Sequence, residues 1–192
     1  MVKDSETNIL YLSELLKTNP KYSSFYSKLS QILKKNNISV ELLKGTKDIW
    51  AKDYMPIQVR PDRFIQFVYD PDYLYPKEYR KYKTDPDEVL SHLSIKPFKS
   101  KILIDGGNVV KAVDKVILTD KVYTENYSGW VSDMKKIPES FKNGIRKKLR
   151  DLFEKAEIII IPRLPGDYIG HSDGIVRFLD NKTVLIFNPD PN

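Results

Sequence analysis

The chain has 192 residues, the length of a single domain, and its composition of 41% hydrophobic and 30% charged residues is ordinary for a globular protein. It contains no cysteine, which excludes disulfide bonds, thiolate zinc sites and a cysteine nucleophile within these residues. No apolar run approaches the roughly 20 residues needed to cross a bilayer, and the N-terminus lacks the pattern of a secretory signal. We therefore expect a cytoplasmic location and no membrane partner.

The net charge of +6 raises the question of a nucleic-acid partner. The densest basic run, residues 146–150, falls in a predicted helix that also carries Asp151 and Glu154. This mixture is typical of a solvated helix face, so we expect no nucleic-acid partner.

The first elements in chain order are two predicted helices. Residues 5–19 are predicted to be amphipathic, with Ile9, Leu12, Leu15 and Leu16 at helical spacing. The second helix has Asn19 as its N-cap and Pro20 at its first position. Its expected buried face consists of Phe25, Leu29, Ile32 and Leu33.

A predicted strand over 38–43 and a loop over 44–53 lead to a predicted hairpin over 55–69. Residues 69–86 are rich in tyrosine, proline and charge and are predicted to be a long irregular loop. Such a loop either covers a site or is a surface connection, and the second interpretation is favoured.

The pattern of helix, strand, aspartate and hairpin then recurs. A helix over 84–93 with Asp85 as its cap precedes a strand over 101–104, Asp105 and a hairpin over 106–119. A helix that Pro138 opens precedes a strand over 157–162, then Asp173 and a hairpin over 174–187. The sequence thus predicts a repeat architecture in one α/β domain. Its parts are residues 1–43 (N-terminal helices and first strand), 44–100 (hairpin and linker of the first repeat), 101–137 (second repeat) and 138–192 (third repeat).

Asp53, Asp105 and Asp173 occupy the same place in the three repeats and are expected to converge. Clustered carboxylates need a cation, and the planar donors of a guanidinium match carboxylates two at a time. A magnesium or calcium site remains an alternative. His171 is the candidate proton donor and acceptor, whereas His92, in a predicted helix, is interpreted as structural.

Neighbouring residues are candidates for the walls of this site. Gly106 and Gly107 suit either a positive φ or a close approach of the backbone to a ligand, and Gly170 and Gly174 flank residues 171–173 in the same way. Ordinary hairpin and turn chemistry is the other interpretation of these glycines, and the two are compatible. Trp50 is either a pocket wall or a core residue.

Three segments resemble agmatine deiminases and the related bacterial-type peptidylarginine deiminases. "DIWAKDYMPIQV" is similar to their W-x-R-D-x-x-P segment, "LIDGGNVV" to E-G-G-N, and "GHSDGIVRF" to G-H-x-D. No single motif is specific, but the three occur in the family's order. The resemblance implies the five-bladed α/β propeller of the pentein superfamily, of which this chain would hold about three repeats as the N-terminal part of a longer protein.

The resemblance also implies the chemistry and the site. In this family a cysteine thiolate attacks the guanidinium carbon, ammonia leaves, and water hydrolyses the adduct, with no metal or other cofactor. Carried over, Asp53 and Asp173 grip the guanidinium, His171 moves protons and Asp105 orients His171. The implied binding residues are Asp53, Asp173, Trp50, Gly107 and Asn108, and the implied partner is agmatine, arginine or peptidyl arginine.

The chain departs from the family pattern in three ways. Lys52 replaces an arginine, Asp105 replaces a longer glutamate, and the nucleophilic cysteine is missing. We therefore expect the isolated chain to be inactive and to self-associate through exposed strand edges. A non-catalytic guanidinium-binding or interaction module and a metal-dependent hydrolase are the alternative functions.

Overall fold

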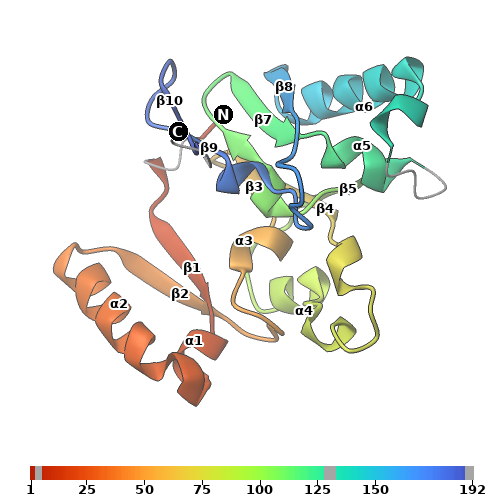
Figure 1. Cartoon of the computed structure of the whole chain (residues 1–192). Helices are drawn as coiled ribbons and strands as arrows, with labels where there is room; N and C mark the ends of the chain where they lie inside the picture. The colour runs from red at the N-terminus through yellow and green to blue at the C-terminus, as the bar shows by residue number, and fades with distance from the viewer. Residues whose placement is uncertain (3–5, 128–132, 189–192) are drawn as a thin grey trace.

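The structure, a computed structural model, describes residues 1–2, 6–127 and 133–188 (Figure 1). Its strands are short and form four small sheets. The strands are β1 (Ile9–Ser13), β2 (Ser39–Leu43), β3 (Ile57–Arg60), β4 (Arg63–Val68), β5 (Phe98–Leu103), β6 (Val110–Lys111), β7 (Lys115–Thr119), β8 (Glu157–Ile161), β9 (Val176–Phe178) and β10 (Val184–Ile186).

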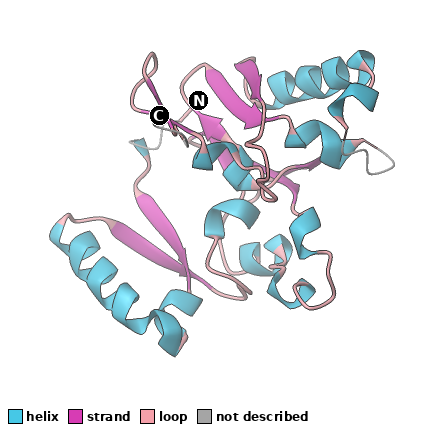
Figure 2. Ribbon diagram, in the orientation of Figure 1, coloured by secondary structure: helices cyan, strands magenta, loops and turns pink. Residues whose placement is uncertain are grey.

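Helices connect these strands and lie around the sheets (Figure 2). The α-helices are α1 (Leu15–Thr18), α2 (Ser23–Lys35), α3 (Ala51–Tyr54), α4 (Pro86–Leu90), α5 (Lys121–Asn126) and α6 (Glu139–Leu152). The 3₁₀ turns are η2 (Pro20–Tyr22), η3 (Asp72–Leu74), η4 (Arg80–Tyr82), η5 (Gly106–Asn108), η6 (Met134–Lys136) and η7 (Ser172–Gly174). In the part of the chain that the structure describes, no helix combines the length and apolar character needed to cross a membrane.

Two of the sheets have three strands and share one topology. In each, an antiparallel hairpin is followed by a helical crossover and a third strand parallel to the second. The orders are β3-β4-β5 and β6-β7-β8. The strand before Asp105 and the strand before His171 therefore pair with the preceding hairpin. The repeat of helix, strand, aspartate and hairpin along the sequence therefore does not coincide with one sheet, because a helical crossover brings the chain back beside the strand it has just left.

The predicted helix over residues 5–19 is wrong over its first half. Residues Ile9–Ser13 form β1, which pairs in parallel with β2, and only Leu15–Thr18 is helical. A run of four apolar residues fits a strand as well as a helix, and the pairing with β2 decides between them. The loop predicted over 44–53 likewise contains the start of α3.

The second predicted helix is present as α2 from Ser23, and the predicted start at Pro20 is the 3₁₀ turn η2 that leads into it. The side chain of Asn19 accepts a hydrogen bond from the amide of Lys21 in the first turn. Its buried face is narrower than predicted, because Leu33 is buried but Phe25 and Ile32 are each 57% exposed. α2 packs on a lobe of only two strands, β1 and β2, at one side of the molecule (Figure 1), so fewer of its residues are covered.

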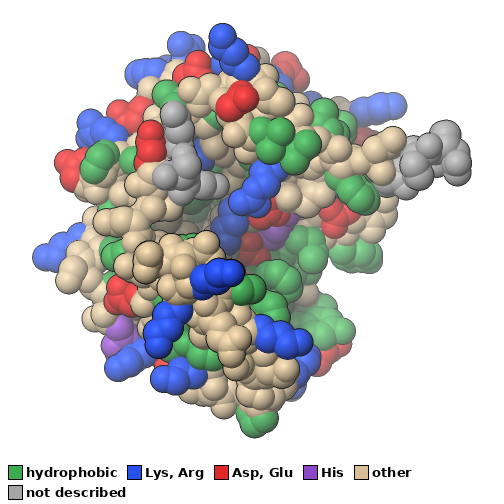
Figure 3. All heavy atoms as spheres, turned by 90° about the vertical axis from the view of Figure 1, so that its left-hand side faces the viewer, with side chains coloured by type: hydrophobic (Ala, Val, Ile, Leu, Met, Phe, Trp, Pro, Cys, Tyr) green, Lys and Arg blue, Asp and Glu red, His purple; other side chains and the backbone are tan. Residues whose placement is uncertain are grey.

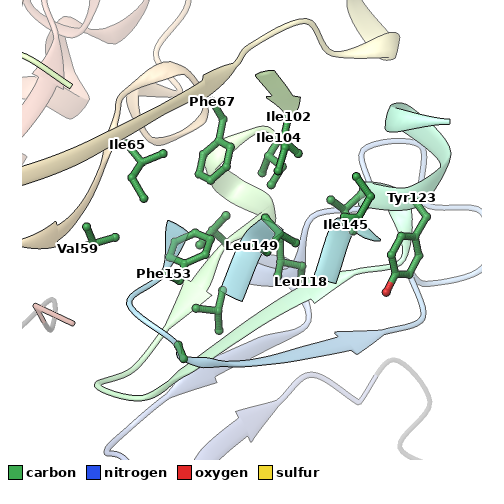
Figure 4. Packing of buried hydrophobic residues seen from close by; sticks show 14 of the residues in the cluster. Val59, Ile65, Phe67, Ile102, Ile104, Leu118, Tyr123, Ile145, Leu149 and Phe153 are labelled. Carbon is green, nitrogen blue, oxygen red and sulfur yellow. The ribbon is translucent and has the colours of Figure 1, made fainter. Parts of the chain in front are cut away.

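The main hydrophobic core lies between the sheets and α6 (Figure 4). Ile145, Leu149 and Phe153 recur at intervals of about one helical turn and point into it. The ring of Phe153 stacks on that of Phe67 in β4, with 5.8 Å between centroids. This core fixes both three-stranded sheets, and with them the loops that follow β5 and β8.

Gly144, in the middle of α6, offers a test of helix stability. A Cβ atom there would meet no described atom within 4 Å, and glycine weakens a helix interior. We expect Gly144→Ala to raise the free energy of unfolding by about 0.5–1 kcal/mol in urea titrations. Gly166→Ala is the matched contrast, since its position is equally open but has φ +78°, and it should destabilise the fold. A lower unfolding midpoint for Gly144→Ala would contradict the placement of residue 144 in α6.

Candidate functional site

The candidate site lies where strands or loops give way to short turns that lead into the hairpins. Asp53 is in α3, just before β3; Asp105 is the N-cap of η5, between β5 and β6; His171 is the N-cap of η7, between β8 and β9. Asp105 and His171 have nearly the same backbone angles, with φ −76° and ψ 137° for the first and φ −81° and ψ 140° for the second. Because η5 packs against both α3 and η7, the equivalent positions meet.

The imidazole of His171 lies between two carboxylates. Its Nε2 is 3.1 Å from Oδ2 of Asp105, and its Nδ1 is 3.7 Å from Oδ1 of Asp53. The first distance is that of a hydrogen bond, whereas the second is too long for one. All three side chains are largely buried, with exposed fractions of 10% for His171, 4% for Asp105 and 14% for Asp53.

Asp173 lies at the outer edge of this group. Its Oδ2 is 2.7 Å from Nζ of Lys52, and the two side chains are 31% and 52% exposed. Its charge acts on Asp53, so all three predicted aspartates contribute to one electrostatic environment. The pair with Lys52 is a solvent-exposed ion pair, which is weak and open to competition by another cation.

The two glycines after Asp105 allow this close packing. The amide of Gly107 donates a hydrogen bond of 3.0 Å to Oδ1 of Asp53. A Cβ atom on Gly107 would overlap with Nδ1 of His171 and come within 2.6 Å of Oδ1 of Asp53. A Cβ atom on Gly106 would overlap with the backbone oxygen of Lys52. Only glycine fits at both positions.

The carboxyl group of Asp53 is the most informative titratable group in the site. Burial raises its pKa to about 6, and the charges of Asp105 and Asp173 act in the same direction. His171 and the amide of Gly107 oppose this rise. Burial also raises the pKa of Asp48, in the loop before α3, to about 6. The imidazole of His171 thus has two carboxylates beside it, and a bound cation would stabilise this group of charges.

Two tyrosines of the long loop after β4 complete the inner wall of the site. Tyr73 meets His171 edge-on, with 6.2 Å between ring centroids and an angle of 69°. Burial, followed by the neighbouring acidic charges, raises the pKa values of Tyr69 and Tyr73, so both hydroxyls stay protonated. The segment 69–86 therefore contacts the site, contrary to the favoured prediction of a plain surface connection. The many tyrosines of this segment were the sequence feature that could have predicted its contact with the site.

The remaining predicted residues lie in different surroundings. Trp50 is 67% exposed at the start of α3. Asn108 is buried, and its side-chain oxygen accepts a hydrogen bond of 2.8 Å from the amide of Thr119, so it links η5 to β7. His92 is exposed just after the end of α4. Across residues 1–2, 6–127 and 133–188, no group of three or more His, Cys, Asp or Glu side chains is arranged to hold a metal ion.

A groove leads to the site from the outside. Its volume is about 570 Å³, and it runs from Lys52, Gly106 and Asp173 along the first strands of the hairpins, β3, β6 and β9. In the space-filling view, a histidine side chain lies recessed among acidic side chains, with basic side chains at the rim (Figure 3). The groove gives a cationic group access to Asp173, whereas Asp53, Asp105 and His171 are not among the residues that line it.

Several solved structures have a similar fold. The chain is 19% identical to the C. jejuni agmatine deiminase, with a TM-score of 0.63 over 92% of this chain and 60% of that one. The same enzyme with substrate bound gives a TM-score of 0.60 at 18% identity, over 92% of this chain and 60% of that one. DDAH from Pseudomonas aeruginosa, complexed with citrulline, gives 0.53 at 9% identity, over 93% and 69% of the two chains. These likenesses show an α/β fold of the DDAH and agmatine deiminase type.

The chain spans about 60% of the length of the agmatine deiminase structures that it matches. No curated protein matches it. The family model of the Porphyromonas-type peptidyl-arginine deiminases matches residues 14–192, which include every residue of the site described above. The chain belongs to the Porphyromonas-type peptidyl-arginine deiminase family.

Proposed function

We propose that this chain supplies the guanidinium-binding and proton-transfer groups of a guanidine hydrolase of the deiminase type. The observation that carries the proposal is the burial of His171 between the carboxylates of Asp105 and Asp53. The carboxylates suit a bound cation, and the imidazole can move protons during a reaction of that cation. A guanidinium fits the carboxylates because it is planar, permanently charged and rich in N–H donors, and its hydrolysis requires proton transfers.

In this proposal Asp53 and Asp173 bind the guanidinium nitrogens. Asp53 reaches the site from α3 and Asp173 from η7, so they can approach the cation from different sides. Lys52 then leaves Asp173, since the substrate replaces its ammonium with a better-matched donor pair. The groove beside Asp173 accommodates the rest of the substrate.

His171 moves protons in the proposed reaction. Asp105 accepts a hydrogen bond from Nε2–H of the neutral ring, which leaves Nδ1 free to face the reacting group. Asp105 also stabilises the imidazolium that forms when His171 takes a proton. Although aspartate is one methylene shorter than glutamate, Oδ2 of Asp105 lies 3.1 Å from Nε2 of His171, which is within hydrogen-bond distance.

The covalent step of this chemistry requires a thiolate, and the 192 residues contain no cysteine. We propose that the chain alone binds guanidino compounds without turning them over. We also propose that its sheets are blades of a propeller, because the two three-stranded sheets share one topology and the other two sheets show parts of it.

The direct test is calorimetry of the chain with two pairs of compounds. Agmatine and arginine should bind, and 1,4-diaminobutane and ornithine, which have similar tails without the guanidine, should bind at least tenfold more weakly. Equal affinities within each pair would show that the site does not recognise a guanidinium.

Guanidinium binding should also depend on pH through Asp53. The pKa of Asp53 is raised to about 6, so the carboxylate is largely protonated at pH 5 and ionised at pH 8. Because the guanidinium keeps its charge throughout, we expect affinity to be about tenfold lower at pH 5 than at pH 8. Calorimetry at both values checks this, and a flat profile would exclude Asp53 as a ligand of the cation.

A further inference from the structure

A fully buried lysine lies behind the site. Lys121, at the start of α5, has a side chain that is only 1% exposed. Its Nζ donates hydrogen bonds of 2.9 Å to Oδ1 of Asp72 and 2.7 Å to the backbone oxygen of Ile169. It also lies 3.4 Å from Oε1 of Glu125, one turn along the same helix. Burying a lysine is costly unless it is paired, and here three segments of the chain share its charge.

Two of these partners, Asp72 and Ile169, lie next to residues close to His171. Asp72 and Tyr73 belong to η3, and Tyr73 is the residue that meets the imidazole edge-on. The ammonium of Lys121 lies 5.0 Å from the centroid of the Tyr73 ring, within range of a cation–π interaction. On the other side, the oxygen of Ile169 is two residues before His171 in the chain.

The backbone around Gly170 reinforces this arrangement. Gly170 has φ +66°, and a Cβ atom there would lie 3.0 Å from Cδ of Lys121. Its carbonyl oxygen accepts a 2.5 Å hydrogen bond from the hydroxyl of Thr119. The backbone just before His171 thus packs on the side chain of Lys121, and hydrogen bonds from Lys121 and Thr119 hold its two carbonyl groups.

We propose that Lys121 is a positioning residue, whose buried ammonium holds Tyr73 and the 168–170 segment against His171 and so fixes the imidazole for guanidinium binding. The proposal rests on the proposed function for its effect on binding, but its effect on His171 is independent of any ligand. Lys121 is itself shielded from the groove and does not contact the substrate. Its aromatic and carbonyl partners, both close to His171, distinguish it from a lysine that merely stabilises the core.

The experiment uses the chain's two histidines, His171 and His92, as reporters. In Lys121→Met we expect the ring C–H resonances of His171 to shift, because the Tyr73 ring no longer lies against it, while those of exposed His92 stay unchanged. We expect agmatine affinity to fall at least tenfold in the same protein. Lys115→Met, which removes a lysine from a partly exposed ion pair in β7, is the matched control and should change neither.

Two further variants separate positioning from folding. Asp72→Asn leaves Lys121 its other partners and should reproduce the His171 shift if Lys121→Met fails to fold. Tyr73→Phe, which keeps the ring, should preserve the His171 resonances, whereas Tyr73→Leu should alter them. Unchanged His171 resonances or unchanged affinity in folded Lys121→Met protein would overturn the proposal. If the unmodified chain binds no guanidino compound but the resonances still shift, the proposed function fails and the positioning role stands.

Discussion

Replacing Gly107 with alanine should abolish guanidinium binding while leaving the fold intact. The new methyl group would overlap with the imidazole of His171 and press on the carboxylate of Asp53, the two groups that the site brings together. Both obstacles are side chains, so they can move, and the cost in stability should be about 1–3 kcal/mol. Calorimetry should show a loss of affinity of at least about 100-fold, because Asp53 also loses its position against the Gly107 amide.

Two other glycines define the controls. Gly174 lies in η7, three residues from His171, and a Cβ atom there would meet no described atom within 4 Å. The Gly174→Ala variant should therefore bind guanidino compounds as tightly as the wild type. Gly106→Ala would press on the backbone of Lys52 and should lower the unfolding midpoint as well as affinity. Equal losses in Gly107→Ala and Gly174→Ala would mean that the glycine effect is not steric.

Local sequence signals predicted the elements whose stability is local. The hairpins over 55–69, 106–119 and 174–187, the cap at Asp85 and the helix after Pro138 are all present. The predicted helix over 9–13 is wrong, because β1 is a strand that lies beside β2. The repeat did not specify that β5 and β8 pair with the hairpins that precede them. Strand pairing depends on tertiary contacts, which no local pattern encodes.

The site follows the same division. Asp53, Asp105 and Asp173 each stand at the head of a hairpin, so the repeat predicted that they would converge, and His171 was a candidate because Asp173 follows two residues later. Tyr73 and Lys121 have no such position. Tyr73 lies in an irregular loop, and Lys121 is in the one-and-a-half-turn helix α5, which was not predicted. A lysine is almost always exposed, so sequence reasoning places it on the surface unless its partners are known.

Asp53→Asn should change binding and stability in opposite directions. Asparagine keeps an oxygen that can accept the hydrogen bond from Gly107 but carries no charge. Because a guanidinium would then lose a buried ionic partner, affinity at pH 8 should fall by at least about 100-fold. Asp62→Asn, at a side chain that is 86% exposed, should affect neither property.

The stability of the same variant should rise, because the folded protein binds the Asp53 proton more tightly than the unfolded chain does. The pKa of Asp53 increases from 3.8 to about 6 on folding, so its favourable contribution is complete below pH 3.8 and is lost as pH rises through about 6. Above pH 6 the wild type carries a buried charge that Asp53→Asn lacks, and the variant should gain about 1–3 kcal/mol at pH 7. Asp173→Asn removes a partly exposed charge that Lys52 already pairs, so it should weaken binding without this gain. If urea titrations show Asp53→Asn less stable than wild type at pH 7, the ionised carboxylate stabilises the fold and its pKa is not raised by folding.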